Sequence, residues 1–189
     1  MIELPGRRSF LQTSFLQAAI TAFPMAALAQ EAEAPTPAKA VCVKHGTDRF
    51  NEALTLGGAN TYACKVSTKD TNGALFLLEE KNLQKGGPPR HVHHSQDEWF
   101  YVLEGEFIAE VGTEKFRLEP GDSLFAPRRV PHAFARVGES DGRLLIGFQP
   151  AGEMEHFFHE IARMPDHAKD EKLYRACGME LLGPPLSVD

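Results

Sequence analysis

Short apolar runs separated by turn residues are the feature that most constrains the fold of this chain. Between residues 61 and 150 these runs recur at nearly regular intervals, and Gly, Pro, Asn and Asp stand between them. They read ALFLLEE, EWFYVL, EFIAEV, KFRLE, SLFAP and RLLIGFQ. Strands of this length and spacing are typical of an all-β barrel or sandwich. We therefore predict an all-β domain whose barrel core covers about residues 65–150.

After residue 150 the apolar period changes from that of a strand to that of a helix. The run GEMEHFFHEIARM places an apolar stripe on one helix face, and DEKLYRACG predicts a second, short helix. The stripe consists of Met154, Phe157, Phe158, Ile161 and Met164. We expect C-terminal helices within 151–180 that cover the outside of the sheet. Their aromatic side chains are expected to pack rather than to bind a cofactor.

The N-terminal segment has the composition of an export signal. Arg7 and Arg8 precede an apolar stretch over 14–22 that is too short to span a bilayer, and small residues allow cleavage after Ala29. The run RRSFL resembles a twin-arginine signal, with an ordinary Sec signal as the alternative. We predict a signal peptide over 1–29 and a periplasmic or secreted protein, with no membrane span in the mature chain.

The rest of the chain narrows its partners and its redox chemistry. Residues 30–40 are rich in Ala, Glu and Pro, which predicts a disordered linker. The net charge of −6 comes without a basic stripe, so nucleic acid is not an expected partner. Cys42, Cys64 and Cys177 form no CxxC pair, which argues against a thiolate metal site. The expected alternatives are a Cys42–Cys64 disulfide or three buried thiols.

The stretch GGPPRHVHHSQDEWFYVLEG concentrates the metal-binding side chains of the sequence. Side chains alternate between the two faces of a strand, so His91 and His93 share one face and His94 points to the other. In the next strand, alternation places Glu98, Phe100 and Val102 together on one face. If that face is interior, one carboxylate joins two imidazoles. His94, and Asp97 just before the second strand, are expected to support the site from outside or to lie on the surface.

Such a buried group of polar side chains predicts a metal ion. Two imidazoles and a carboxylate are costly to bury alone, and a divalent cation removes that cost by binding all three. His132, within GDSLFAPRRVPHAF, is available as a fourth ligand. This mixture of ligands suits iron, manganese, nickel, copper or zinc, and we expect iron or manganese.

The two stretches resemble the two sequence motifs of the cupin family. The first motif is carried by His91, His93, Glu98 and Gly105, and the second by Gly121, Pro127 and His132. Three positions depart from the common pattern: Gly86 is out of register, Arg129 replaces a glycine, and Arg136 replaces an asparagine. The resemblance implies a single-domain jelly-roll barrel (double-stranded β-helix) over 41–189. It also implies one metal held by three histidines and one glutamate.

The resemblance further implies an apolar cavity above the metal and a function for it. The expected lining residues are Phe100, Val102, Phe134, Arg90 and Arg136, with Phe107 and Phe125 as further candidates. The sequence is most similar to single-domain cupins related to quercetin dioxygenase. That likeness predicts a metal-dependent dioxygenase for a small flavonol-like, or other enolisable, phenolic or diketone compound. Glu98 would act as ligand or as general base, and the protein is expected to be a homodimer.

Three other functions remain open from the sequence. An oxalate-type decarboxylase or oxidase would use the same ligands, with Arg90 or Arg136 as a clamp for the dianion. A metal-dependent isomerase would need a general base besides the ligands, and none is evident. A non-catalytic cupin that binds metal or a small ligand needs no catalytic group.

Overall fold

The structure, a computed structural model, describes residues 39–56, 60–82, 84–163 and 170–188. The predicted signal peptide, nearly all of the predicted linker and Met164 lie outside these residues.

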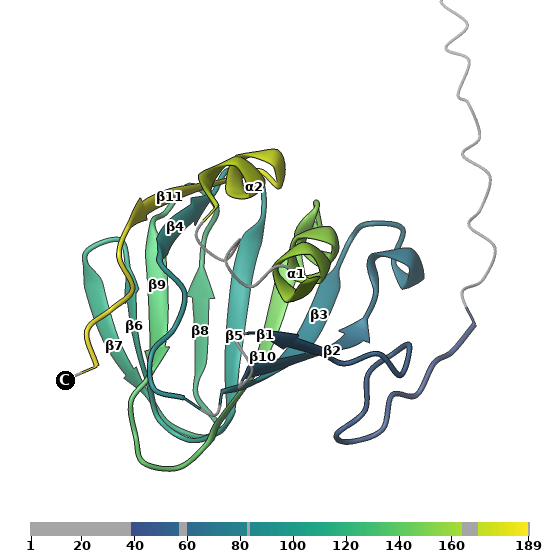
Figure 1. The fold of residues 1–189 in the computed structure, drawn as a ribbon, viewed down its shortest axis with the longest axis horizontal. Helices are drawn as coiled ribbons and strands as arrows, with labels where there is room; N and C mark the ends of the chain where they lie inside the picture. Colours follow the sequence, from purple (N-terminus) through teal and green to yellow (C-terminus); the bar gives the residue numbers. More distant parts are fainter. Residues whose placement is uncertain (1–38, 57–59, 83, 164–169, 189) are drawn as a thin grey trace, which may run out of the picture. The chain divides into compact units, whose positions relative to one another are not determined.

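Within the described residues the chain forms two antiparallel sheets (Figure 1). The first has the order β1 (Leu54–Leu56), β2 (Asn60–Val66), β3 (Phe76–Asn82), β10 (Gly142–Gln149), β5 (Asp97–Glu104) and β8 (Ser123–Ala126). The second has the order β11 (Met179–Gly183), β4 (Arg90–His93), β9 (His132–Arg136), β6 (Phe107–Val111) and β7 (Glu114–Leu118). The α-helices in the described part of the chain are α1 (Met154–Arg163) and α2 (Glu171–Ala176), and η1 (Thr68–Asp70) is a 3₁₀ turn. This arrangement confirms the predicted all-β fold with C-terminal helices.

The alternation of side chains along the strands creates the interior. In β5 the side chains of Glu98, Phe100 and Val102 are buried, while Trp99 and Tyr101 are only partly covered. β10 is registered against β5 so that Phe148 is opposite Glu98 and Ile146 is opposite Phe100. The inner face of this sheet is therefore mostly apolar, and Glu98 is one of its few buried polar residues.

The turn after β5 shows why the sequence places a glycine there. Gly105 has φ +79°, and a Cβ atom at this position would lie 2.6 Å from the carbonyl oxygen of Asp141. Only glycine avoids both the strained dihedral and the close contact. The turn thereby connects β5 to β6 and carries the chain from the first sheet to the second.

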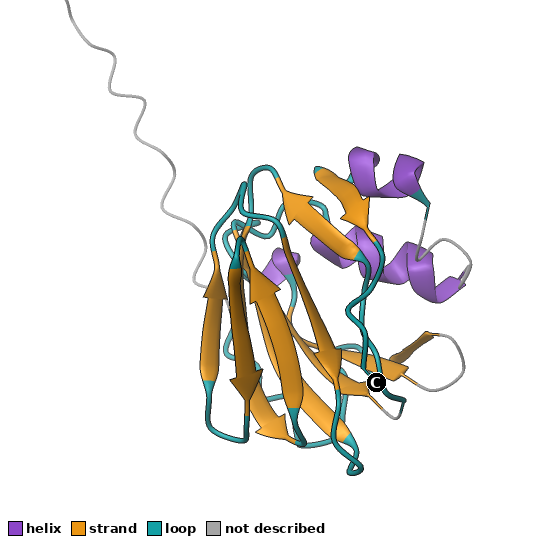
Figure 2. Cartoon of the chain, turned by 90° about the vertical axis from the view of Figure 1, so that its left-hand side faces the viewer, coloured by secondary structure: helices purple, strands orange, loops and turns teal. Residues whose placement is uncertain are grey.

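The helices occupy a different place from the one predicted. Figures 1 and 2 show α1 and α2 on the same side of the strands. The Phe158 ring of α1 contacts Tyr62, Phe76 and Phe148, at centroid distances of 4.9, 6.1 and 5.9 Å, and all three belong to the inner face. The prediction that the helices cover the outside of the sheet is wrong. Packing the apolar stripe of α1 on the inner face covers aromatic side chains of the barrel that would otherwise be exposed to water.

The C-terminal segment also departs from the prediction at its end. Residues 179–183 form the strand β11, which pairs with β4 through Glu180 opposite Val92 and Leu181 opposite His91. The period of a five-residue strand is too short to be recognised beside a helix. The consequence is that β4, which carries two of the predicted metal ligands, is held between β11 and β9.

Two smaller expectations are corrected or decided by the structure. The three cysteines are free, with Cys42 exposed and Cys64 and Cys177 buried, so the Cys42–Cys64 disulfide is absent. Phe125 is 54% exposed because it lies opposite Trp99 on the outer face of the sheet, so it cannot line an interior cavity.

No helix among the described residues is long and apolar enough to cross a membrane.

Candidate metal centre

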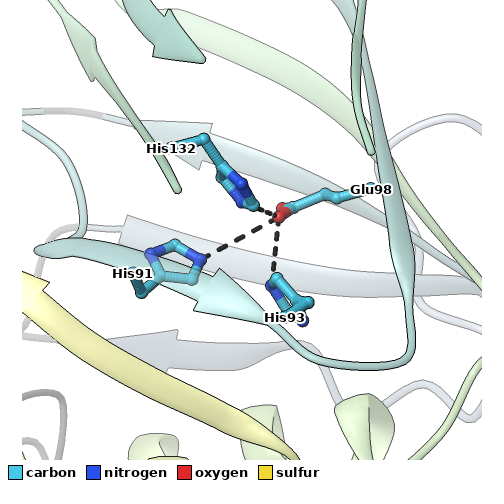
Figure 3. A group of neighbouring side chains, drawn as sticks. All are labelled: His91, His93, Glu98 and His132. Carbon is cyan, nitrogen blue, oxygen red and sulfur yellow. Dashed lines mark hydrogen bonds and ion pairs between the residues drawn. The ribbon is translucent and has the colours of Figure 1, made fainter. Parts of the chain in front are cut away.

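Three strands bring the predicted ligands to one interior point. His91 and His93 lie on β4, Glu98 lies at the start of β5, and His132 begins β9. His91 and His132 are direct partners in the β4–β9 pairing. Figure 3 shows the three imidazole rings directed toward the Glu98 carboxylate.

The geometry of this group matches a metal site without rearrangement of the backbone. The Glu98 Oε2 atom lies 2.7 Å from His132 Nε2, 3.2 Å from His93 Nε2 and 3.9 Å from His91 Nε2. One donor atom from each of the four residues lies within 4.8 Å of all the others. All four side chains are buried, and none is more than 7% exposed.

Backbone carbonyl groups orient two of the imidazole rings. His91 Nδ1 lies 2.8 Å from the carbonyl oxygen of Pro89, and His132 Nδ1 lies 3.0 Å from that of Val130. In the tautomer that satisfies these carbonyls, Nδ1 carries the proton and donates it. This leaves Nε2 of His91 and His132 directed to the centre, where a metal ion would take the place of the proton that His132 Nε2 shares with Glu98 at 2.7 Å.

His93 provides the test of whether a metal fits. Its side chain is 1% exposed, yet neither ring nitrogen makes a well-formed hydrogen bond within the described part of the chain. A buried polar atom without a partner costs about 1 to 3 kcal/mol. A cation bound by Nε2 would remove part of this cost, so the donor set fits a divalent transition metal of the kind that accepts both imidazole and carboxylate ligands.

The electrostatics of the group favour the metal-binding protonation state at Glu98 and His91 but not at His132. Burial lowers the pKa of His132, but its hydrogen bond to the Glu98 carboxylate outweighs burial and raises the pKa, so a metal would have to displace that proton. Burial raises the pKa of Glu98, but the hydrogen bond from His132 and the proximity of His93 lower it by more than burial raises it. The net pKa lies below the usual value, so the carboxyl is ionised at neutral pH. Burial, together with the nearby His132, lowers the pKa of His91 to about 3. A charged carboxylate and a neutral imidazole are the forms that act as ligands.

A largely apolar cavity of about 270 Å³ opens onto this group of side chains. His91, His93 and Glu98 form one part of its wall. The larger apolar side chains of the wall are Leu56, Phe134, Ile146, Phe148, Met154, Phe157, Phe158, Ile161, Tyr174 and Met179. The helical stripe of α1 therefore lines the cavity as well as packing on the barrel. The volume lies just below the range of about 300–1,000 Å³ typical of sites for drug-sized ligands, which suits a small ligand.

The structure places the predicted apolar lining residues at different depths. Phe134 lines the cavity as predicted. Phe100 and Val102 do point inward, but Phe100 packs against the rings of His132 and Phe134, and Val102 is 1% exposed beyond it. Phe107 is fully buried in the core. These three residues support the wall of the site without forming its surface, because alternation alone fixes the face of a side chain and not its depth.

The two arginines predicted for the cavity are engaged elsewhere. Arg90 donates to Glu110 Oε2 at 3.1 Å and to the carbonyl oxygen of Gly112 at 2.7 Å. Arg136 donates to backbone carbonyl groups of Gln84 and Gly138, at 3.0 and 2.9 Å. Neither arginine lines the cavity. The prediction failed because a guanidinium reaches the nearest acceptors, which sequence position does not reveal.

The departures from the common motifs have visible structural roles. Arg129 adopts φ +66°, in the left-handed region that favours glycine, and its backbone N–H donates to the carbonyl oxygen of His93 at 2.7 Å. Asp97 accepts hydrogen bonds from the backbone N–H and side chain of Arg128. Together these contacts fasten the turn before His132 to the ends of β4 and β5. His94 is exposed, as predicted.

Polar residues of the cavity that the sequence analysis missed lie on β2 and β3. Asn60, Tyr62 and Glu80 line the same cavity as His91, His93 and Glu98. Alternation along β3 puts Glu80 on the same face as Phe76 and Leu78, so this signal was present in the sequence. The roles of Tyr174 and α1 depend on packing between distant segments, and no local pattern announces them.

The fold and the site define a class of protein: a double-sheet barrel with a buried group of three histidines and one glutamate at the wall of a cavity. Comparison with known families agrees with this class. The cupin domain model matches residues 81–148, which include both motifs. An uncharacterized protein of Streptomyces coelicolor, SCO3923, is 31% identical over 83 residues, which make up 40% of this chain and 78% of that protein. The chain belongs to the cupin family.

Several relatives are named as dioxygenases, for quercetin or for 3-hydroxyanthranilate. Quercetin 2,3-dioxygenase of Bacillus subtilis is 28% identical over 100 residues, covering 52% of this chain and 29% of the relative. A 3-hydroxyanthranilate 3,4-dioxygenase of Bacillus cereus is 33% identical over 102 residues, covering 49% of this chain and 52% of the relative. The chain thus spans about half the length, or less, of these two enzymes.

Proposed function

We propose that this cupin is a metal-dependent dioxygenase acting on a small phenolic or otherwise enolisable compound. One observation carries the proposal. Three imidazoles and one carboxylate converge within 4.8 Å at the wall of an apolar cavity of about 270 Å³. This arrangement suits a divalent transition metal next to a small organic ligand.

The four residues have separate duties in this proposal. His91, His93 and His132 would hold the ion through Nε2, and Glu98 through Oε2. The ion, with iron or manganese as the preferred choices, would supply Lewis acidity toward an enolate or phenolate oxygen and a place for dioxygen. Glu98 has a second possible duty, because a carboxylate held at the cavity wall is positioned to accept the hydroxyl proton of the substrate.

The walls of the cavity would position the substrate and exclude water. Phe157 and Tyr174 are in edge-to-face contact at a centroid distance of 5.0 Å, and the Tyr174 ring lies 5.9 Å from that of His91. These aromatic groups come from α1 and α2, so the helices close the cavity directly beside the metal centre. An aromatic or enolic ring would find planar, apolar surfaces there. A dry wall also strengthens the polar contacts of the bound ligand.

The relatives support oxygen chemistry, and the positions of the arginines weaken one rival. Relatives carry the names quercetin 2,3-dioxygenase and 3-hydroxyanthranilate 3,4-dioxygenase, and the second name specifies a hydroxyl group on the substrate. An oxalate-type decarboxylase or oxidase needs a cationic clamp for a small dianion. Among the described cavity residues the cation is Lys85, and its Nζ pairs with Glu139 at 2.5 Å. We therefore rank oxalate chemistry below the dioxygenase, and a non-catalytic binding protein remains the second candidate.

The test is dioxygen consumption by metal-replete protein. We expect uptake with at least one member of a panel of flavonols, catechols and 1,3-diketones, and loss of most of that activity in Glu98→Gln. His94→Gln is the matched control, because His94 lies next to the site and is exposed. Release of carbon dioxide from oxalate would assign the oxalate reaction instead. Protein that holds metal and ligand but consumes no dioxygen with any compound would favour the binding protein.

We also propose export to the periplasm in a folded, metal-loaded form. The proposal rests on Arg7 and Arg8 followed by a short apolar stretch and a small-residue cleavage site. Detection of the chain, cut after Ala29, in the periplasmic fraction of expressing cells is the expected result.

A further inference from the structure

A second carboxyl group lies in the cavity and belongs to no part of the metal centre. Glu80 projects from β3 on the same face as Phe76 and Leu78, is 3% exposed, and lines the cavity. Apart from the ligands, the motifs of the sequence contain no evident general acid or base. Glu80 is a group of that chemical type, and its surroundings indicate what it does.

The partners of Glu80 are neutral. Asn82 Nδ2 donates to Glu80 Oε1 at 2.6 Å, and the Tyr62 side chain is also hydrogen-bonded to the carboxyl. Within the described part of the chain, no lysine, arginine or histidine lies within ion-pair distance of Glu80. A carboxylate can accept about four hydrogen bonds, so two neutral donors leave acceptor positions open. A buried charge without a counter-ion is costly, and proteins retain such groups mainly where a ligand uses them.

The register of the sheet places Glu80 away from the metal. Glu98 is opposite Phe148, and Phe148 is opposite Phe76, whereas Glu80 lies four residues further along β3. Two strand spacings and four residues correspond to about 10 Å across the sheet and about 13 Å along it. These are backbone separations, and the Glu98 charge still raises the pKa of Glu80. Glu80 therefore lines a separate part of the cavity wall from Glu98 and faces a different part of whatever fills the cavity.

We propose that Glu80 is a specificity-determining residue that accepts a hydrogen bond from a second hydroxyl or amino group, at the end of the ligand remote from the metal centre. This inference rests on the proposed function, because it assumes a ligand whose first oxygen is held at the metal. It adds a requirement to the substrate class. The compound is bifunctional, with a chelating keto-enol or phenol at one end and a hydrogen-bond donor at the other.

The protonation of Glu80 agrees with this role. Burial and, to a smaller extent, the negative charge of Glu98 raise the pKa of Glu80 to about 7. The hydrogen bonds from Asn82 and Tyr62 act in the opposite direction but do not cancel this rise. Slightly above neutral pH the carboxylate would thus be present in a site of low dielectric constant. A hydrogen bond to a charged acceptor there is about twice as strong as one between neutral groups.

The experiment compares two ligands that differ by one hydroxyl group. Manganese-loaded protein is titrated with 3-hydroxyflavone and with 3,4′-dihydroxyflavone, at pH 8 and without dioxygen, so that binding is measured and turnover is not. We expect the added hydroxyl to tighten binding by about 10-fold or more in the wild type, the usual contribution of a hydrogen bond to a charged group. In Glu80→Gln the advantage should fall below about 3-fold.

Glu79→Gln serves as the matched control. Glu79 is the neighbouring residue on β3, and its side chain pairs with Lys65 and Arg143 instead of lining the cavity. It should keep the full preference for the dihydroxy compound. A thermal melt of each variant separates a binding role from a structural one, since it requires no ligand.

The outcomes are distinguishable. Lost preference in Glu80→Gln, with a melting temperature equal to or above that of the wild type at pH 8, supports the inference. Equal binding of both flavones by the wild type, or a preference that survives Glu80→Gln, overturns it while leaving the proposed function intact. A melting temperature lowered by more than about 4 °C would overturn it in favour of a structural role. Failure of both flavones to bind wild-type protein would overturn the substrate class in both proposals.

Discussion

The buried carboxyl of Glu80 should make the stability of this protein depend on pH in an unusual direction. Burial raises the pKa of Glu80 from 4.5 to about 7 in the folded state. Between these two values the folded protein holds a proton that the unfolded chain has released. Folding therefore becomes less favourable as pH rises from about 4.5 to about 7, which is opposite to the usual behaviour of an acidic residue.

The size of the effect follows from the change in pKa. A difference of one pKa unit corresponds to about 1.4 kcal/mol, so the raised pKa of Glu80 costs about 3 kcal/mol of stability once the pH is well above 7. Glu80→Gln removes the titration and keeps the shape and an acceptor for Asn82. We expect the variant to match the wild type near pH 4.5 and to exceed its free energy of unfolding by about 3 kcal/mol near pH 8.

The assay is urea unfolding of both proteins across pH 4.5 to 8, in the presence of a chelator. Comparison at each pH cancels the titration of the histidines, which both proteins share. The control is Glu79→Gln. In the wild type the Glu79 carboxyl pairs with Lys65 and Arg143, and its pKa is lowered. A difference between Glu80→Gln and the wild type that is constant across this pH range would refute the reasoning, because it would mean that Glu80 titrates alike in both states.

Three further predictions concern packing, assembly and export. Phe158→Ala should lower the free energy of unfolding by about 3 to 5 kcal/mol in chemical denaturation, because the Phe158 ring contacts three aromatic side chains of the barrel. A loss below about 1 kcal/mol would mean that α1 is not an integral cover of the cavity. Phe125 is 54% exposed beside Trp99 on the outer sheet face, and we propose this face as a homodimer contact. Phe125→Glu should then give a monomer in analytical ultracentrifugation, whereas an unchanged sedimentation coefficient would exclude this face. Replacing both Arg7 and Arg8 by Lys should retain folded, metal-loaded protein in the cytoplasm. Export through a Sec signal should instead enrich the periplasmic protein in copper or zinc, because these metals bind such sites more tightly than manganese or iron. Identical metal content by both routes would show that export does not select the metal.

The sequence predicts the convergence of the four side chains well because the relevant rules are local. His91 and His93 share a strand face by alternation, and Glu98 begins the next alternating strand, so their convergence needs only two strands and a connection. His132 was placed by motif resemblance, and the structure pairs it directly with His91. The same alternation, applied to β3, would also have placed Glu80 inside.

The cavity was predicted less well because its walls depend on contacts between distant segments. The apolar stripe of α1 is visible in sequence, but which surface it covers depends on the aromatic residues that the barrel leaves uncovered. Arg90 and Arg136 lie beside motif positions, yet their side chains turn to Glu110 and to backbone carbonyls that no local pattern reveals. Depth within the barrel, which separates Phe134 from Phe100, is likewise a property of the packed structure.

The metal content of purified protein tests the central claim most directly. Wild-type protein isolated without chelators should contain about one divalent transition-metal ion per chain by inductively coupled plasma mass spectrometry, as expected for a single four-residue site. His132→Ala should lose that ion while remaining folded by circular dichroism. His94→Ala, one residue from a predicted ligand but exposed, should retain it. Stoichiometric metal in His132→Ala, or equal loss in both variants, would contradict the assignment of His91, His93, Glu98 and His132 as the metal centre.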